Sequence, residues 1–207
     1  MQELMVQYGC GLSSPSGWKN FDASPTLRIQ KLPVIGPMLT RGRPVFPASV
    51  RFGDVVAGLP VADGAAKAVY CSHVLEHLSL KDFRTSIAET YRILASGGIF
   101  RGVVPDIERL IADYNACLEP DAALRFMRGT LLGQEARPRG IRAFLTGSLG
   151  NSEHRWMWDY KAMAAELEAA GFRDIRRAVF GDSANTQFNA VEDRYRWDGC
   201  LGFECRK

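Results

Sequence analysis

The stretch that decides the fold is AVYCSHVLEHLSL, residues Ala68 to Leu80. It opens with the apolar run of a buried strand and then contains His73, Glu76 and His77 in the spacing H-x-x-E-H. In inverted zinc peptidases, that spacing puts two metal-binding histidines one helical turn apart, with the glutamate as base. Here the motif follows directly on a strand, and the helical pattern begins only near Ser79. No downstream glutamate stands out as a third ligand, so the sequence predicts no metal site.

Strand and helix patterns alternate on both sides of this stretch. Apolar residues Phe83, Ile87, Tyr91 and Leu94 recur at helical spacing, and Gly97-Gly98 are expected to end that helix. A second amphipathic helix is predicted within 159–172. Strands are predicted at 4–8, before Asp22, before Asp54, at 65–72, at 98–105, within 172–183 and within 199–207. This order is typical of an α/β fold with a mostly parallel twisted sheet and helices on both faces.

Two segments interrupt the alternation. Residues 25–47 hold five of the ten prolines, which allows at most a short helix there. Residues 107–119 have a helical pattern, and the Arg- and Gly-rich residues 122–149 fit no clear element. We therefore predict a single domain over 1–207 with a helical, Arg-rich insertion at about 107–155.

Composition excludes several classes of protein. The chain has 207 residues, of which 46% are hydrophobic and 24% charged, as in ordinary globular domains. The net charge of +3 is too small to indicate nucleic acid, and no apolar run approaches the roughly 20 residues that span a membrane. The N-terminus lacks the pattern of a signal peptide, and five scattered cysteines are expected to be reduced thiols. These features predict a cytoplasmic location.

Small and acidic residues stand where the predicted strands end. Gly9 and Gly11 follow the first strand, and Asp22 and Asp54 end the second and third. Ligands of open parallel sheets bind outside these strand ends, where a carboxylate can accept hydrogen bonds from a ribose diol or an adenine amine. Nicotinamide binding is disfavoured, because Ser14 replaces the third glycine and Asp22 comes only 11 residues after Gly11. A nucleoside-like ligand is expected.

The order of these pieces resembles a class I S-adenosylmethionine-dependent methyltransferase, and more narrowly the type-11-like branch. The resemblance rests on GCGLSSPSGWKNFDASP, GDVVAGLPVADGAAKAVYCSHVLEHL, AETYRILASGGIFRGVVPDIERL and EHRWMWDYKAMAAELEAAGFRDIRRAVFGDS, and it covers nearly the whole chain. It implies a Rossmann-like methyltransferase fold, with S-adenosylmethionine as cofactor and methyl transfer to a small molecule or glycan as function.

The resemblance also implies roles for the residues at the strand ends. Gly9 and Gly11 would lie against the methionine part of the donor. Asp22 would hold the ribose hydroxyls, Asp54 the adenine amine, and Val55 would pack on the adenine ring.

The resemblance also implies roles in the same pocket for residues of the stretch 68–80. Ser72 and His73 would form the floor of the pocket beside the donor. Glu76 and His77 would orient the helix that follows. On this interpretation, the H-x-x-E-H string is the end of the fourth strand and the turn into its helix.

Three departures from the family pattern support a rival hypothesis. Gln7 stands where an acid is usual, Ser13 replaces the third glycine, and 12–21 is too short to hold both a helix and a strand. The helix after the first strand is therefore predicted to be shortened or missing. The rival is a methyltransferase-like binding or scaffold protein without catalysis.

Candidates for acceptor chemistry come after the fifth strand. His154 and Asp106 are the predicted catalytic residues, with Trp156 and Tyr160 as further candidates, although the aromatic cluster around 156–158 equally suits a core. A cluster of arginines in this region suggests an anionic acceptor. Nucleic acid is disfavoured as a partner because few aromatic residues accompany these arginines. They are Arg125, Arg128, Arg137, Arg139 and Arg142. A homodimer is compatible with the sequence.

Overall fold

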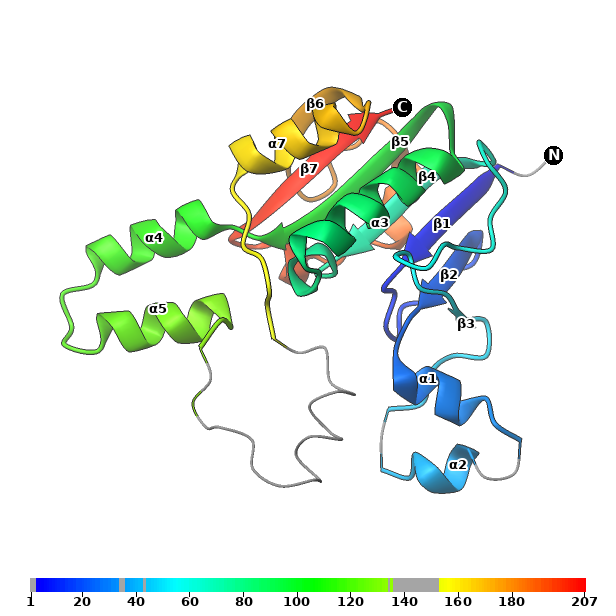
Figure 1. Cartoon of the computed structure of the whole chain (residues 1–207), viewed down its shortest axis with the longest axis horizontal. Helices are drawn as coiled ribbons and strands as arrows, with labels where there is room; N and C mark the ends of the chain where they lie inside the picture. The colour runs from blue at the N-terminus through cyan, green and yellow to red at the C-terminus, as the bar shows by residue number, and fades with distance from the viewer. Residues whose placement is uncertain (1–2, 34–35, 43, 134, 136–152) are drawn as a thin grey trace.

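The computed structural model describes residues 3–33, 36–42, 44–133, 135 and 153–207. These residues form a seven-stranded sheet in the order β3-β2-β1-β4-β5-β7-β6 (Figure 1). The strands are β1 (Leu4–Tyr8), β2 (Trp18–Asp22), β3 (Arg51–Phe52), β4 (Ala66–Ser72), β5 (Leu94–Pro105), β6 (Arg173–Ala178) and β7 (Cys200–Arg206). Neighbours from β3 to β5 pair in parallel, and β7 runs antiparallel to both β5 and β6. The predicted mostly parallel α/β sheet is confirmed.

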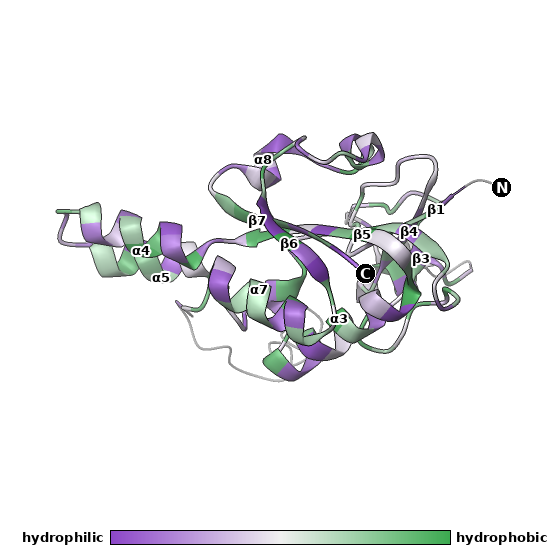
Figure 2. Ribbon diagram, turned by 90° about the horizontal axis from the view of Figure 1, so that it is seen from above, coloured by the Kyte–Doolittle hydropathy of each residue, from purple (hydrophilic) through white to green (hydrophobic). Residues whose placement is uncertain are grey.

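Alternating side chains of the strands enter two cores on opposite faces of the sheet. In β4, Val69 and Cys71 belong to one core, and Ala68 and Tyr70 to the other. Helices α3 (Leu80–Ile93) and α7 (Tyr160–Ala169) cover the first core, while η2 (Thr186–Ala190) and α8 (Arg194–Trp197) lie over the second (Figure 2). Both faces are covered, as predicted, but the second face has only short helices.

The helix predicted after residues 68–80 begins where it was expected and ends earlier than expected. Ser79 caps α3, with its side chain accepting a hydrogen bond from the backbone N–H of Asp82. The helix ends at Ile93 and β5 begins at Leu94, so Gly97 lies inside the strand. The expectation that Gly97-Gly98 end the helix was wrong, because Leu94 is already extended and pairs with Ala66 of β4.

No helix follows β1. Residues 9–17, all of them described, join β1 to β2 through turns, which confirms the predicted loss of that helix. Among its described residues, the proline-rich part holds two short helices, α1 (Pro25–Gln30) and α2 (Gly36–Leu39), one more than expected. The opening stretch itself contains the short 3-10 helix η1 (Leu75–His77) between β4 and α3.

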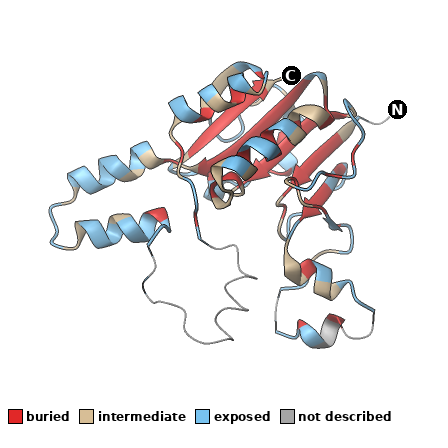
Figure 3. Ribbon diagram, in the orientation of Figure 1, coloured by how far each residue is buried: buried red, intermediate tan, exposed pale blue. Residues whose placement is uncertain are grey.

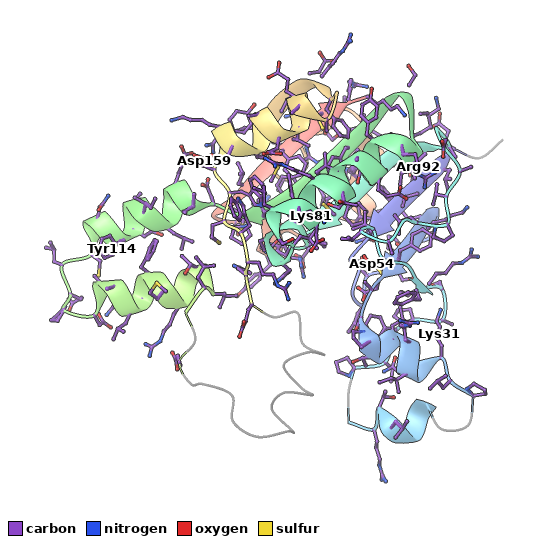
Figure 4. The ribbon with its side chains drawn as sticks, viewed as in Figure 1. Lys31, Asp54, Lys81, Arg92, Tyr114 and Asp159 are labelled. Carbon is purple, nitrogen blue, oxygen red and sulfur yellow. The ribbon has the colours of Figure 1, made fainter. Side chains whose placement is uncertain are left out.

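Two helices leave the body of the domain after β5. α4 (Ile107–Ala116) and α5 (Ala122–Thr130) form a hairpin that projects beyond the sheet, and most of its surface is exposed (Figures 1 and 3). Tyr114, labelled in Figure 4, packs on Phe126 across the hairpin with ring centroids 5.6 Å apart. Of the basic residues noted above, Arg137, Arg139 and Arg142 lie outside the described residues. The predicted division into one domain with an insertion stays a prediction.

A buried arginine ties the second face to the sheet. Arg101 of β5 is fully buried and pairs with the carboxylates of Asp182, Glu192 and Glu204. Its guanidinium lies 4.5 Å from the centre of the Trp197 ring of α8. A fully buried charge requires such partners, so this network fixes the segment that carries η2 and α8. None of the described helices has the length and apolarity that a membrane crossing requires.

Candidate functional site

A cavity of about 560 Å³ opens at the carboxyl ends of β1, β2 and β4. The strand order reverses here, because β2 and β4 lie on opposite sides of β1, and open α/β sheets bind ligands at such a point. The cavity is lined by Tyr8, Gly9, Asp22, Ala23, Ser24, Pro25, Gly53, Asp54, Val55, Val56, His73, Val74, His77, Leu78, Asp82 and Arg155. Five residues predicted to bind the cofactor are therefore brought together: Gly9, Asp22, Asp54, Val55 and His73.

Asp22 ends β2 and is held in place by backbone hydrogen bonds. Its Oδ2 accepts the N–H of Gly11 at 2.8 Å, and its Oδ1 accepts the N–H of Ser24 at 2.8 Å. An ionised carboxylate has about four lone-pair sites, so two sites remain for a ligand. The carboxylate is 8% exposed and lines the cavity. It is an oriented acceptor that suits a pair of hydroxyl groups.

Asp54 lies two residues beyond β3 and is labelled in Figure 4. Its Oδ1 accepts the N–H of Val56 at 2.9 Å, which leaves Oδ2 without a described partner. Val55, next to it, is 5% exposed and offers an apolar wall to the same cavity. A carboxylate beside an apolar surface suits an adenine ring with its amine.

The two glycines after β1 have different roles. Gly9 has a φ of +61°, and a Cβ on it would lie 2.2 Å from Cγ2 of Val74. Only glycine therefore lets the backbone lie this close to Val74 in the wall of the cavity. Gly11 has a φ of +55° with open space around it, and it acts through its N–H on Asp22 rather than as part of the cavity wall.

Ser72 and His73 at the end of β4 are placed differently from each other. Ser72 does not line the cavity, and its Oγ accepts a hydrogen bond from Nε of Arg196 at 2.8 Å. His73 lines the cavity, with Nε2 at 2.9 Å from the carbonyl of Arg196. Burial alone lowers the pKa of His73, but Cys200, the Glu76 carboxylate and the Arg196 carbonyl outweigh it and raise the pKa to about 10.

Neither predicted catalytic residue lines the cavity. His154 is 8% exposed, and its Nδ1 lies 2.8 Å from the carbonyl of Thr130. Burial lowers the pKa of His154, with the Glu76 carboxylate opposing this effect. Asp106 caps α4 through the N–H of Glu108 and faces Arg177 at 3.5 Å.

The aromatic candidates are distributed between core and surface. Trp158 is buried and packs on Phe83 with ring centroids 4.1 Å apart, which is a core contact. Trp156 is 40% exposed and lies beside Trp158. The hydroxyl of Tyr160 donates to the carbonyl of Ile175 at 3.2 Å. None of the three aromatic residues lines the cavity.

Several cavity residues were not predicted from the sequence. Arg155 and Asp82 bring charges to the wall, and His77 brings an imidazole. Arg155 reaches the cavity because its backbone N–H donates to the carbonyl of Glu76 at 2.7 Å. A signal for Arg155 existed, since it adjoins His154 in a segment already singled out, but its contact with η1 is long-range.

Comparison with known proteins agrees with this geometry. Residues 8–101 match the model of a family described as methyltransferase domain. A chain in the complex between the Haloferax volcanii Trm112 methyltransferase activator and a putative methyltransferase is 17% identical, with a TM-score of 0.51 over 99% of this chain and 82% of that one.

Two further solved structures are similar. A Thermotoga maritima S-adenosylmethionine-dependent methyltransferase, described as a possible histamine N-methyltransferase, is 16% identical, with a TM-score of 0.53 over 98% of this chain and 81% of that one. Phosphoethanolamine N-methyltransferase 2 of Haemonchus contortus, solved with S-adenosylmethionine, is 12% identical, with a TM-score of 0.50 over 100% of this chain and 49% of that one. No curated protein matches the chain.

These findings confirm the resemblance to class I S-adenosylmethionine-dependent methyltransferases, with the family match confined to residues 8–101. The predicted Rossmann-like methyltransferase fold is confirmed over nearly the whole chain. The match to a methyltransferase domain agrees with the predicted cofactor, S-adenosylmethionine, with which the Haemonchus contortus protein was solved.

Proposed function

We propose that the protein transfers a methyl group from S-adenosylmethionine to a small-molecule or glycan acceptor. The observation that carries the proposal is the joint placement of Asp22 and Asp54 in one open cavity beside Gly9. Sequence reasoning reached these residues from the strand ends, independently of the cavity, and their chemistry matches the two polar ends of an adenosine.

The lining residues suggest one orientation for the donor. The remaining lone pairs of Asp22 accept the ribose hydroxyls, and Oδ2 of Asp54 accepts the adenine amine beside Val55. The methionine part then extends along Gly9 towards His73. The acidic residues Asp22, Asp54 and Asp82 outnumber the basic residues of the wall, Arg155 and His73, which favours a ligand that carries a sulfonium cation.

Methyl transfer requires alignment more than acid–base chemistry. A lone pair of the acceptor attacks the methyl carbon in line with the carbon–sulfur bond, and that bond's electrons remain on sulfur as S-adenosylhomocysteine leaves. The protein contributes by holding the two reactants in that line, and a base is needed only where the acceptor must lose a proton. His154 and Asp106 remain the predicted catalytic residues, and both would need a path into the cavity.

Arg155 supports an anionic acceptor. It lines the cavity, is exposed, and has no ion-pair partner among the described residues. A cation there would pair with a carboxylate or phosphate, either on the acceptor or on the methionine part of the donor. The acceptor class that fits best is therefore a small acid or a phosphorylated compound.

The rival function keeps the cavity but lacks turnover. It is favoured by the direct β1–β2 connection, which leaves no helix N-terminus over the donor site. A scaffold of this kind would transfer no methyl group.

A methyl-transfer assay separates the two functions. The protein is incubated with methyl-labelled S-adenosylmethionine and pooled acids, amines, sugars and sugar phosphates, and release of S-adenosylhomocysteine is measured. We expect release that depends on one pool and is lost in Asp54→Ala, with Asp63→Ala, an exposed aspartate outside the cavity, as the matched control. Donor binding without release from any pool would favour the scaffold.

A further inference from the structure

All three histidines of the chain surround one buried carboxylate. Glu76 of η1 is fully buried, and neither of its carboxylate oxygens receives a hydrogen bond. His73 Nδ1 lies 3.2 Å from Glu76 Oε1, and His154 Nε2 lies 4.0 Å from the same atom. His77 and His154 meet edge to face with ring centroids 5.0 Å apart. A buried carboxylate is costly unless it is paired or binds a metal, and the partners that face Glu76 are imidazole nitrogens.

Backbone carbonyls fix which nitrogen each histidine can offer. His77 Nδ1 lies 3.1 Å from the carbonyl of Glu153, and His154 Nδ1 lies 2.8 Å from the carbonyl of Thr130. A carbonyl only accepts hydrogen bonds, so both Nδ1 atoms carry a proton, and in the neutral form of each ring Nε2 then keeps its lone pair. Histidines that ligate metals are oriented in this way, with the second nitrogen donating to a carbonyl or carboxylate.

We propose that Glu76, His77 and His154 bind a divalent transition-metal ion of the Zn²⁺ class. One ligand atom from each residue lies within 4.8 Å of the others. Two ligands that each sit about 2.1 Å from a tetrahedral ion are roughly 3.4 Å apart, so small side-chain rotations would close the site.

The donor set selects the kind of metal. Two imidazoles and one carboxylate form the ligand set of open zinc sites in enzymes, whereas Mg²⁺ and Ca²⁺ prefer oxygen ligands alone. Three protein ligands leave at least one position of the ion for another molecule. The site thus has the composition of a working metal centre rather than a closed structural one.

Sequence reasoning missed this site because the third ligand is distant in the chain. His154 is brought to η1 by two backbone hydrogen bonds, in which Arg155 and Trp156 donate to the carbonyl of Glu76 at 2.7 and 3.1 Å. The H-x-x-E-H string also contributes different ligands from those of a zinc peptidase. His73 directs its Nε2 to the carbonyl of Arg196, so the proposed ligands from the string are Glu76 and His77.

The site adjoins the donor cavity through His77, which lines it. The following step rests on the proposed function. An oxygen of the acceptor would occupy the open position of the ion, which would lower the pKa of a hydroxyl and direct its lone pair towards the donor's methyl group. The acceptor class is then a hydroxyl or carboxylate compound rather than an amine.

The test is metal binding by the full chain in the absence of any methyl donor. The protein is freed of metal with a chelator, and Zn²⁺ is titrated by calorimetry, while Co²⁺ is titrated by visible absorption. We expect one Zn²⁺ per chain and a Co²⁺ spectrum of low coordination number. We expect binding at least about tenfold weaker in His154→Gln and in Glu76→Gln. Glu166→Gln, a carboxylate paired with Arg84 on the surface, is the matched control and should bind as wild type.

Circular dichroism checks that each variant is folded, and His77→Gln replaces either variant that is not, because His77 is half-buried and easier to change. No stoichiometric binding by folded wild-type protein would overturn the proposal and leave the ion pair with His73 as the partner of this carboxylate. Binding that is unchanged in all the folded variants of the site would overturn it too. Neither result depends on methyl transfer, so this proposal and the proposed function fail separately.

Discussion

Gly9 and Gly11 offer a matched pair for testing how the donor cavity is built. Both have a positive φ, so alanine at either position costs about 1–2 kcal/mol of backbone strain. They differ in space, because a Cβ at Gly9 would lie 2.2 Å from Cγ2 of Val74, whereas a Cβ at Gly11 meets nothing within 4 Å. Overpacking of this kind adds about 1–3 kcal/mol. Gly9→Ala should therefore cost about 2–5 kcal/mol and Gly11→Ala about 1–2 kcal/mol.

The assay is urea unfolding of both variants, followed by donor binding. Val74 lines the cavity, so displacing it should also weaken S-adenosylhomocysteine binding in Gly9→Ala more than in Gly11→Ala. The double variant Gly9→Ala/Val74→Ala removes the clash, and a double-mutant cycle should return a favourable coupling of about 1–3 kcal/mol. Equal unfolding free energies for Gly9→Ala and Gly11→Ala would show that a Cβ at Gly9 does not clash with Val74, as would a coupling energy near zero between the two positions.

Three further predictions follow from charged residues. Arg101→Leu leaves the fully buried carboxylate of Glu192 without a cation, while Asp182 and Glu204 keep Arg176, and it should lower the free energy of unfolding by about 3–5 kcal/mol in urea. The exposed Arg109→Leu should lower it by less than about 0.5 kcal/mol. A hydrogen bond from Arg92 lowers the pKa of Glu89 below its ordinary 4.5. This pair therefore stabilises the fold above pH 4.5, and its contribution is lost as the pH falls further. Urea unfolding in a pH series should show a smaller loss of unfolding free energy at low pH in Glu89→Gln than in wild type. Arg155→Gln should weaken binding of anionic acceptors and leave S-adenosylhomocysteine binding unchanged, and equal loss of both in competition assays would contradict the role given to Arg155.

Local patterns predicted most of the sheet and the strand-end residues of the cavity. The ends of β1, β2 and β4 follow from short apolar runs that stop at a glycine or a polar residue, and Ser79 marks the start of α3 by its capping chemistry. Parallel strands bring their carboxyl ends to one edge, so Gly9, Asp22 and Asp54 were placed together without any knowledge of the side-chain contacts.

Long-range contacts account for what the sequence did not predict. The end of α3 is set by pairing of Leu94 with β4, which no local signal announces. The cover of the second face depends on Arg101 reaching carboxylates about 80 or more residues away. The positions of Arg155 in the cavity and of His154 beside Glu76 both depend on the backbone hydrogen bonds that Arg155 and Trp156 donate to the carbonyl of Glu76. Single-sequence patterns carry no information on such pairings.

The proposed function requires that the cavity beside Gly9 bind a methyl donor through Asp22. Titration calorimetry of S-adenosylhomocysteine into wild-type protein and Asp22→Ala tests it most directly, with circular dichroism to confirm that both are folded. We expect wild-type protein to bind with micromolar affinity and Asp22→Ala to bind about 100-fold or more weakly, because two hydroxyl hydrogen bonds to a charged acceptor disappear. No binding by folded wild type, or binding that the substitution leaves unchanged, would contradict it.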